Sequence, residues 1–199
     1  MQSRTRQNPG HLVWMDLEMT GLDPDTDTIL EMAILITDAE LDIVAEGPSI
    51  AIHQDESVLS AMNDWCKEHH GASGLSARVR QSDIDMLAAE SMALDFVRRF
   101  VPERTSPLCG NSIHQDRRFL ARHMPKLEAY MHYRNIDVST IKELARRWYA
   151  GIAPPVKRSA HLAMDDIRES VAELAYYRQT VFVPSLALET GVPAGSKQM

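Results

Sequence analysis

The chain has little cysteine and no long apolar segment. Only two of its 199 residues are cysteines, Cys66 and Cys109, and neither lies at the spacing of a metal-ligand motif. They are expected to be free thiols in a reducing compartment, which favours a cytoplasmic protein over a disulfide-stabilised secreted one. No apolar run approaches the ~20 residues that cross a bilayer, and the first residues lack the apolar core of a signal peptide. The sequence therefore predicts no association with a membrane.

An excess of positive charge is also missing. The chain has 21 lysines and arginines against 28 aspartates and glutamates, a formal net charge of −7. Proteins that bind long nucleic acids through many phosphates usually present a basic face, so this balance argues against a long nucleic acid as partner. It is compatible with a short one. The basic residues that are candidates for holding a few phosphates are Arg117, Arg118, Arg134, Lys157 and Arg158.

The order of the expected elements predicts an α/β fold with a mixed five-stranded sheet. Apolar runs that predict strands lie at 11–16, 29–37, 41–52, 106–110 and 136–138. Helical patterns cover 57–100, where Ser82 and Asp85 resemble a capping box, then 113–123, a segment starting near Thr140, and 161–181. The first three strands would form an antiparallel meander, with a turn at 38–40. Because these strands show little alternation, helices are expected on both faces.

Four acidic residues at well separated positions are candidates for one metal site. Asp16 and Glu18 occur in LVWMDLEMTG, Asp116 in GNSIHQD and Asp166 in HLAMDDI. Residues i and i+2 of a strand point to the same side, so the first two can reach one ion together. Converging carboxylates repel one another unless divalent cations neutralise them. With His161 beside the last acid, the set suggests metal-assisted hydrolysis of a phosphodiester.

Each of these residues also has an ordinary structural interpretation. Asp16 and Glu18 can be acids at a strand end, because D-x-E is a short and common pattern. Asp116 and Asp165 suit a helix N-terminus, where an acid complements the helix dipole, so one member of the pair Asp165 and Asp166 is a candidate for a purely structural role. His161 can be an inert residue at a helix start. The ordered combination of D-x-E, N-x4-D and H-x4-D favours a shared site.

The same segments resemble the DEDD superfamily of 3′-to-5′ exonucleases in its histidine branch, and within that branch the oligoribonuclease family. The resemblance covers about residues 11–180 and is carried by WMDLEMTGLDP, ILEMAILITD, CGNSIHQDRRFL, IDVSTIKELARRW and HLAMDDIRESVAELAYYR. It implies a ribonuclease H-like fold over a single exonuclease domain, 10–182, with peripheral tails at 1–9 and 184–199. The chain departs from the family in the tails and in APPVKRS, the loop before His161.

The resemblance also implies a set of roles for the acidic residues and the histidine. Asp16, Glu18, Asp116 and Asp166 would hold two Mg²⁺ or Mn²⁺ ions, with Asp16 shared between them. His161 would be the general base. An unperturbed histidine titrates near pH ~6.5, so a neutral imidazole is available at cellular pH to accept a proton.

A second set of residues is implied for substrate binding. Leu22 would insert between two bases, and Trp65 would stack on a base with His70 nearby. Ser112, Arg134 and Ser139 would bind a 5′ phosphate, joined by Tyr133 from the second subunit of a homodimer. A groove closed in this way accepts about two nucleotides, so the expected substrates are short oligoribonucleotides, dinucleotides above all, and the products nucleoside 5′-monophosphates.

Several alternatives stay open at this point. Trp65 can be a core residue, Leu22 an ordinary turn residue, and Ser112 and Ser139 helix caps. The rival functions are a DNA proofreading or repair exonuclease of the same superfamily, a non-catalytic nucleic-acid-binding module, and a metal-dependent phosphatase acting on small nucleotides. The intact set of acids with His161 speaks against the binding module, because binding alone needs no such set.

Overall fold

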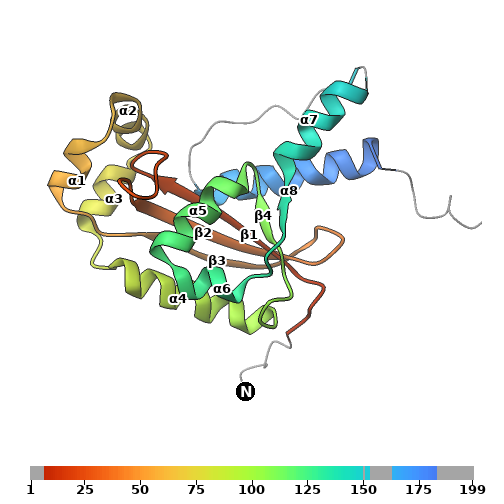
Figure 1. Cartoon of the computed structure of the whole chain (residues 1–199), viewed down its shortest axis with the longest axis horizontal. Helices are drawn as coiled ribbons and strands as arrows, with labels where there is room; N and C mark the ends of the chain where they lie inside the picture. The colour runs from red at the N-terminus through yellow and green to blue at the C-terminus, as the bar shows by residue number, and fades with distance from the viewer. Residues whose placement is uncertain (1–6, 150, 153–162, 183–199) are drawn as a thin grey trace, which may run out of the picture.

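The computed structural model describes residues 7–149, 151–152 and 163–182, which form a mixed sheet flanked by helices (Figure 1). The strands are β1 (Leu12–Met19), β2 (Ile29–Thr37), β3 (Ile43–Ala51), β4 (Leu108–Gly110) and β5 (Asn135–Asp137). They lie in the order β3-β2-β1-β4-β5. β2 is antiparallel to both β1 and β3, whereas β4 pairs in parallel with both β1 and β5. The expected antiparallel meander and mixed five-stranded sheet are confirmed.

Helices cover both faces of this sheet. On one face lie α4 (Met86–Phe100), α5 (Ile113–His123) and α6 (Pro125–Tyr130), which share a core with Val13 and Met15 of β1. On the other lie α7 (Val138–Trp148) and α8 (Ala163–Thr180), which share a core with Trp14. All nine residues of β2 are buried, which is the expected result for a strand covered on both sides. None of the helices in the described part of the chain has the length and apolar character needed to span a membrane.

The long helical region after β3 is divided into four helices. Three short ones, α1 (Glu56–Ala61), α2 (Asp64–Ala72) and α3 (Leu75–Gln81), pack around Leu30 in a small core of their own, and α4 follows. The predicted capping box of Ser82 and Asp85 is wrong. Ser82 ends α3 and donates its hydroxyl to Ala51 O (2.6 Å), whereas Asp85 is itself the N-cap of α4 and accepts from Ala88 N–H (2.8 Å).

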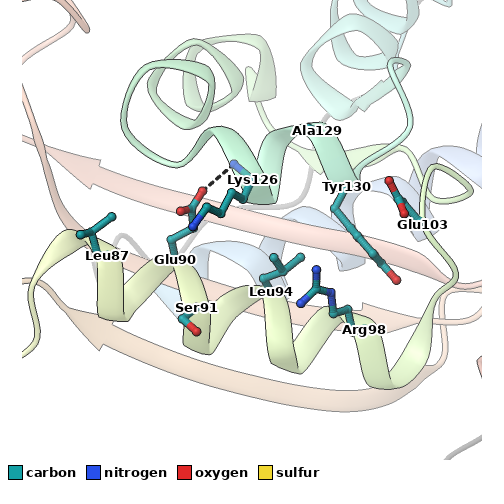
Figure 2. A pocket seen from close by; sticks show the side chains of 9 residues that line it. All are labelled: Leu87, Glu90, Ser91, Leu94, Arg98, Glu103, Lys126, Ala129 and Tyr130. Atoms are coloured by element: carbon teal, nitrogen blue, oxygen red, sulfur yellow. Dashed lines mark hydrogen bonds between the residues drawn. The ribbon is translucent and has the colours of Figure 1, made fainter.

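α6, which begins at Pro125 soon after α5 ends at His123, was not predicted from the sequence. Proline suits the first turn of a helix, where its missing N–H costs nothing. The acceptor for this helix start comes from another helix. Glu90 of α4, only 3% exposed, accepts from Lys126 N–H at 2.6 Å (Figure 2). The same oxygen accepts from Leu127 N–H at 3.2 Å. A contact across 36 residues of sequence therefore permits a helix where local sequence indicated only a stop.

Two elements near the predicted site residues begin or end at other residues than predicted. β1 continues to Met19, so Asp16 and Glu18 both lie within the strand, whereas the predicted strand ended at Asp16. α7 begins at Val138, two residues before the expected Thr140, because Asp137 caps it by accepting from Ser139 N–H (3.0 Å).

Candidate active site

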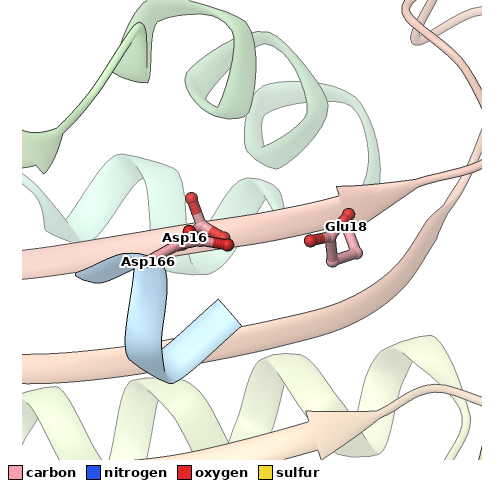
Figure 3. Close-up of side chains that lie close together, drawn as sticks. All are labelled: Asp16, Glu18 and Asp166. Carbon is pink, nitrogen blue, oxygen red and sulfur yellow. The ribbon is translucent and has the colours of Figure 1, made fainter. Parts of the chain in front are cut away.

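Three of the four predicted acids lie close together where the start of α8 packs against β1. Asp16 and Glu18 project from β1, and Asp166 projects from the first turn of α8 (Figure 3). One carboxylate oxygen from each lies within 4.8 Å of the others. This arrangement follows from packing. Trp14 of β1 and Ala163 of α8 belong to the same hydrophobic core. Asp16 lies two residues after Trp14 on the strand, so its side chain points to the same face of the sheet. The ordinary strand-end interpretation of Asp16 and Glu18 does not account for this convergence.

Asp116 approaches the cluster from the opposite side, across the edge of β1. β4 pairs with β1 only at Val13 and Trp14. Further along, the Asp116 carboxylate takes the place of a strand: its Oδ1 accepts a hydrogen bond from Leu17 N–H at 2.9 Å. Asp116 lies in the first turn of α5, yet only 7% of it is exposed, so it is more than a surface acid complementing the helix dipole.

The carboxylates in this region are costly to ionise together. Burial raises the pKa of Glu18 from 4.5 to about 7, and the charges of Asp166, Glu31 and Asp116 add to the shift. Burial also raises the pKa of Asp116, from 3.8 to about 7. Oxygen ligands gathered at this density, with a negative charge that needs compensation, suit a hard divalent cation such as Mg²⁺ or Mn²⁺. The residues present therefore fit a metal site.

The structure separates the neighbouring acids Asp165 and Asp166. Asp165 accepts from Arg168 Nη1 (2.8 Å) on the same helix, and Arg168 also pairs with Glu46 of β3 (2.8 Å). Asp165 is thus the structural member of the pair, and Asp166 is the one beside Asp16 and Glu18. His161 lies outside the described residues, as do Lys157 and Arg158 of the preceding loop, so their predicted roles stay predictions.

A pocket of about 630 Å³ adjoins the acids at the end of β1. Its lining includes Glu18, Leu22, Trp65 and His70, which brings three of the predicted substrate residues next to one predicted metal ligand. Leu22 is 69% exposed and Trp65 is 60% exposed, so the interpretation of Trp65 as a core residue is wrong. The Trp65 indole stacks on His69 with ring centroids 3.9 Å apart, which leaves an aromatic surface at the pocket.

His70 lines this pocket but is almost fully buried. It is 4% exposed, and its Nε2–H donates to Met19 O at 2.9 Å while Nδ1 lies 3.9 Å from Glu18 Oε2. Burial lowers the pKa of His70, which favours the neutral ring. His70 therefore supports the end of β1, next to Glu18.

The turn that carries Leu22 is organised by Asp27, which the sequence analysis did not single out. The Asp27 carboxylate accepts from Thr20 Oγ1 (2.9 Å) and from Asp23 N–H (3.0 Å). A Cβ at Gly21 would collide with this carboxylate, so a side chain there would displace Asp27 from these hydrogen bonds. Repeated aspartates within GLDPDTDT were the available sequence signal, because aspartate side chains commonly close turns onto the backbone.

The predicted phosphate-binding residues form a second group at the start of α5 and α7. The hydroxyls of Ser112 and Ser139 lie 3.5 Å apart. Asp137 orients both: its Oδ1 accepts from Ser112 N–H (2.9 Å), Ser139 N–H (3.0 Å) and Ser139 Oγ (2.6 Å). Ser112 does occupy the N-cap position of α5, but its side chain makes no cap bond. The capping interpretation of Ser139 is wrong, because Asp137 caps α7.

Tyr133 and Arg134 lie on the exposed segment before β5. Tyr133 is 72% exposed, and the guanidinium carbon of Arg134 lies 5.4 Å from the centroid of its ring. Within the described residues, no carboxylate lies at ion-pair distance from Arg134, whereas Arg117 pairs with Glu128 (2.9 Å). Arg134 is therefore the better candidate for a phosphate, and Arg117 is not available for one.

The exonuclease family whose model is named for RNase T matches residues 13–174. An oligoribonuclease of Pseudomonas paraeruginosa is 60% identical over 173 residues, which cover 86% of this chain and 96% of that protein. The oligoribonuclease of Pseudomonas syringae pv. tomato is 60% identical over 181 residues, covering 89% and 99%. The chain belongs to the oligoribonuclease family of exonucleases. The matched region includes all four acids that were predicted to bind metal, Asp16, Glu18, Asp116 and Asp166.

Solved structures confirm the fold. The chain superimposes on the zinc-bound form of an Escherichia coli exonuclease I–single-stranded DNA complex with a TM-score of 0.69 at 15% identity, covering 88% of this chain and 41% of that one. For exonuclease I of Methylocaldum szegediense the TM-score is 0.63 at 19% identity, covering 86% and 41%. The chain described here thus matches about two fifths of the length of each of these two structures. The expected ribonuclease H-like fold is correct.

Proposed function

We propose that the protein is a metal-dependent 3′-to-5′ exoribonuclease of the cytoplasm, with residues 10–182 as its single exonuclease domain. Its substrates would be very short RNAs, dinucleotides in particular, and its products nucleoside 5′-monophosphates. One observation carries the proposal: Glu18 belongs both to the acidic cluster and to the lining of the pocket that presents Leu22 and Trp65. A short RNA bound in this pocket would place its backbone next to carboxylates suited to divalent cations.

Asp16, Glu18, Asp116 and Asp166 would hold two divalent cations, Mg²⁺ or Mn²⁺, with Asp16 contacting both. When bound, such cations lower the pKa of water and stabilise charge on both oxygens of an in-line displacement. His161 would accept the proton of the attacking water. The bond from the water oxygen to phosphorus forms, the bond to the 3′ oxygen breaks, and the 3′ oxygen leaves as a hydroxyl after protonation from solvent.

Leu22 and Trp65 would bind the bases of the substrate. A side chain inserted between bases, or stacked on one, must be exposed in the free protein, and both residues are. His70 would support the same pocket by holding the end of β1, the strand that carries Glu18.

Ser112, Ser139 and Arg134 would bind the 5′ phosphate, joined by Tyr133 of a second subunit in a homodimer. An arginine fork suits a terminal phosphate, and the exposed Tyr133 is available to a neighbouring molecule. Ser112 precedes Asp116 by one helical turn, so α5 sets the distance between the phosphate group and the acids. A fixed distance of this kind would select substrates by length.

A length series tests the proposal. RNAs of two to seven nucleotides, each with and without a 5′ phosphate, are incubated with and without Mg²⁺, beside an RNA and a DNA 20-mer. We expect Mg²⁺-dependent release of 5′-monophosphates, fastest from the phosphorylated dinucleotide. Preferential cleavage of the DNA 20-mer would indicate a repair-type exonuclease instead. Release of inorganic phosphate would indicate a phosphatase, and binding without cleavage a non-catalytic module.

A further inference from the structure

Arg117 lies beside a predicted metal ligand yet points away from the acids, toward the segment that carries Tyr133 and Arg134. We infer that Arg117 is a positioning residue that fixes this segment, and thereby gives the enzyme its discrimination for substrates with a 5′ phosphate. The inference rests on the proposed function, because it presumes that Arg134 meets the 5′ end of a short RNA.

The Arg117 guanidinium is bonded at each of its nitrogens. Nε–H donates to Glu128 Oε1 of α6 (3.0 Å). Nη1–H donates to Asn135 Oδ1 (2.8 Å) and to Arg134 O (3.2 Å), and Nη2–H donates to His132 O (2.9 Å). The Arg117 side chain is only 16% exposed. One side chain thus contacts both ends of the 132–135 segment and the helix before it.

Two backbone bonds also hold this segment: His132 N–H donates to Ser106 O (2.9 Å), and Leu108 N–H donates to Arg134 O (3.3 Å). Residues 131–134 form neither helix nor strand, and the β-ladder with β4 begins only at Asn135. Carbonyl groups in such a turn need donors, and the planar five-donor fork of arginine supplies several at fixed angles. Lysine carries a single nitrogen and cannot reproduce this pattern. Arg117 supplies the donor to His132 O and a second donor to Arg134 O, so the direction in which Arg134 and Tyr133 project depends on Arg117 together with these backbone bonds.

Arg117 follows the predicted metal ligand Asp116 in the sequence, but the two side chains have different partners. Its neighbour Asp116 accepts from Leu17 N–H (2.9 Å) on β1. Successive helix residues project about 100° apart, so Asp116 can face the sheet while Arg117 faces the turn. A change at Arg117 should displace the phosphate-binding segment and leave the acids in place.

The experiment compares Arg117→Lys with Arg146→Lys as a matched control. Arg146 is an exposed arginine of α7 that pairs with Glu143 on the same helix (3.0 Å). Three substrates are used: a 5′-phosphorylated dinucleotide, its 5′-hydroxyl analogue, and a nitrophenyl ester of a nucleoside 5′-monophosphate, which has no 5′ nucleotide. For Arg117→Lys we expect KM of the phosphorylated dinucleotide to rise about tenfold, while kcat for the nitrophenyl ester stays within about twofold.

The preference for the phosphorylated over the hydroxyl dinucleotide should fall toward unity in Arg117→Lys and stay unchanged in Arg146→Lys. Manganese affinity, measured by electron paramagnetic resonance, should be equal in all three proteins. Asn135→Ala, which removes one acceptor of Arg117 at an exposed position, should shift the preference in the same direction by a smaller factor; this variant also serves if Arg117→Lys fails to fold.

Equal losses on all three substrates, or an unchanged preference in both Arg117→Lys and Asn135→Ala, would overturn the inference. A wild-type enzyme that cleaves dinucleotides without regard to the 5′ phosphate would also overturn it and leave the exoribonuclease function standing. A wild-type protein that cleaves no dinucleotide would instead refute the proposed function.

Discussion

Glu31 lies directly opposite Glu18 in the antiparallel pairing of β1 and β2. Two carboxylates therefore project side by side at the acidic cluster, because residues paired across strands share a face. Glu31 is only 3% exposed, and Arg78 of α3 binds both of its oxygens, at 2.9 and 3.1 Å. Arg78 thus neutralises the acid that stands beside the predicted ligand Glu18 and orients it away from the role of a ligand.

Replacing Arg78 alone should lower the unfolding free energy more than replacing both Arg78 and Glu31. Arg78→Gln leaves the buried Glu31 without its cation, and we expect a loss of about 2 kcal/mol in unfolding free energy, discounted because the Arg78 side chain is 38% exposed. Glu31→Gln in the same chain should restore part of that loss. Urea denaturation in EDTA of the two single variants and the double variant measures the coupling. Strictly additive effects would contradict this account.

The metal-free protein should become less stable as the pH rises from about 4 to about 7. Glu18 and Asp116 have pKa values of about 7 in the fold against 4.5 and 3.8 ordinarily, so the unfolded chain loses these protons first. Their stabilising contribution is complete below the ordinary values and is lost as the pH passes through the raised ones. Thermal unfolding in EDTA measures this slope. Saturating Mg²⁺ or Mn²⁺ should reduce it, since cations replace the protons; an equal slope with metal would argue against a metal site here.

Asp16→Asn and His161→Ala should separate metal binding from proton transfer. Asp16→Asn removes a charge from the cluster, and we expect manganese affinity and activity to fall together. His161→Ala should keep the affinity and lower turnover by ~10²-fold or more, the usual contribution of a general base. Manganese titration beside single-turnover kinetics distinguishes the two, and a loss of affinity in His161→Ala would make His161 a ligand.

His123 should influence substrate binding through the Leu22 turn. Its Nε2 lies 3.1 Å from Pro24 O and 3.0 Å from Asp27 O, so the end of α5 holds this turn in place. We expect His123→Ala to raise KM for dinucleotides several-fold with little change in kcat, and His123→Gln, which retains a donor, to recover part of the loss. Arg98→Ala, at an exposed position of α4 that pairs with Asp95 (3.8 Å), is the control. A fall in kcat alone would refute a positioning role.

Elements with a strong local pattern were predictable residue by residue. The apolar run at 29–37 coincides with β2, and the periodic segment at 113–123 coincides with α5. Prediction failed where a distant group decides the local structure. Pro125 indicates a helix stop in sequence, but the buried Glu90 supplies acceptors that let α6 start there.

The sequence by itself determined which chemical groups are available and in what order: D-x-E, N-x4-D and the acids at the start of the last helix, on strands and helices whose periodicity is local. Only the tertiary structure decided which partner each group takes. Asp166 rather than Asp165 joins the cluster, Arg117 holds a turn instead of a phosphate, and Asp116 binds a strand 99 residues away. The physical reason is that hydrogen bonds and ion pairs act over a few ångströms, whereas sequence order alone leaves the distance between remote segments undetermined.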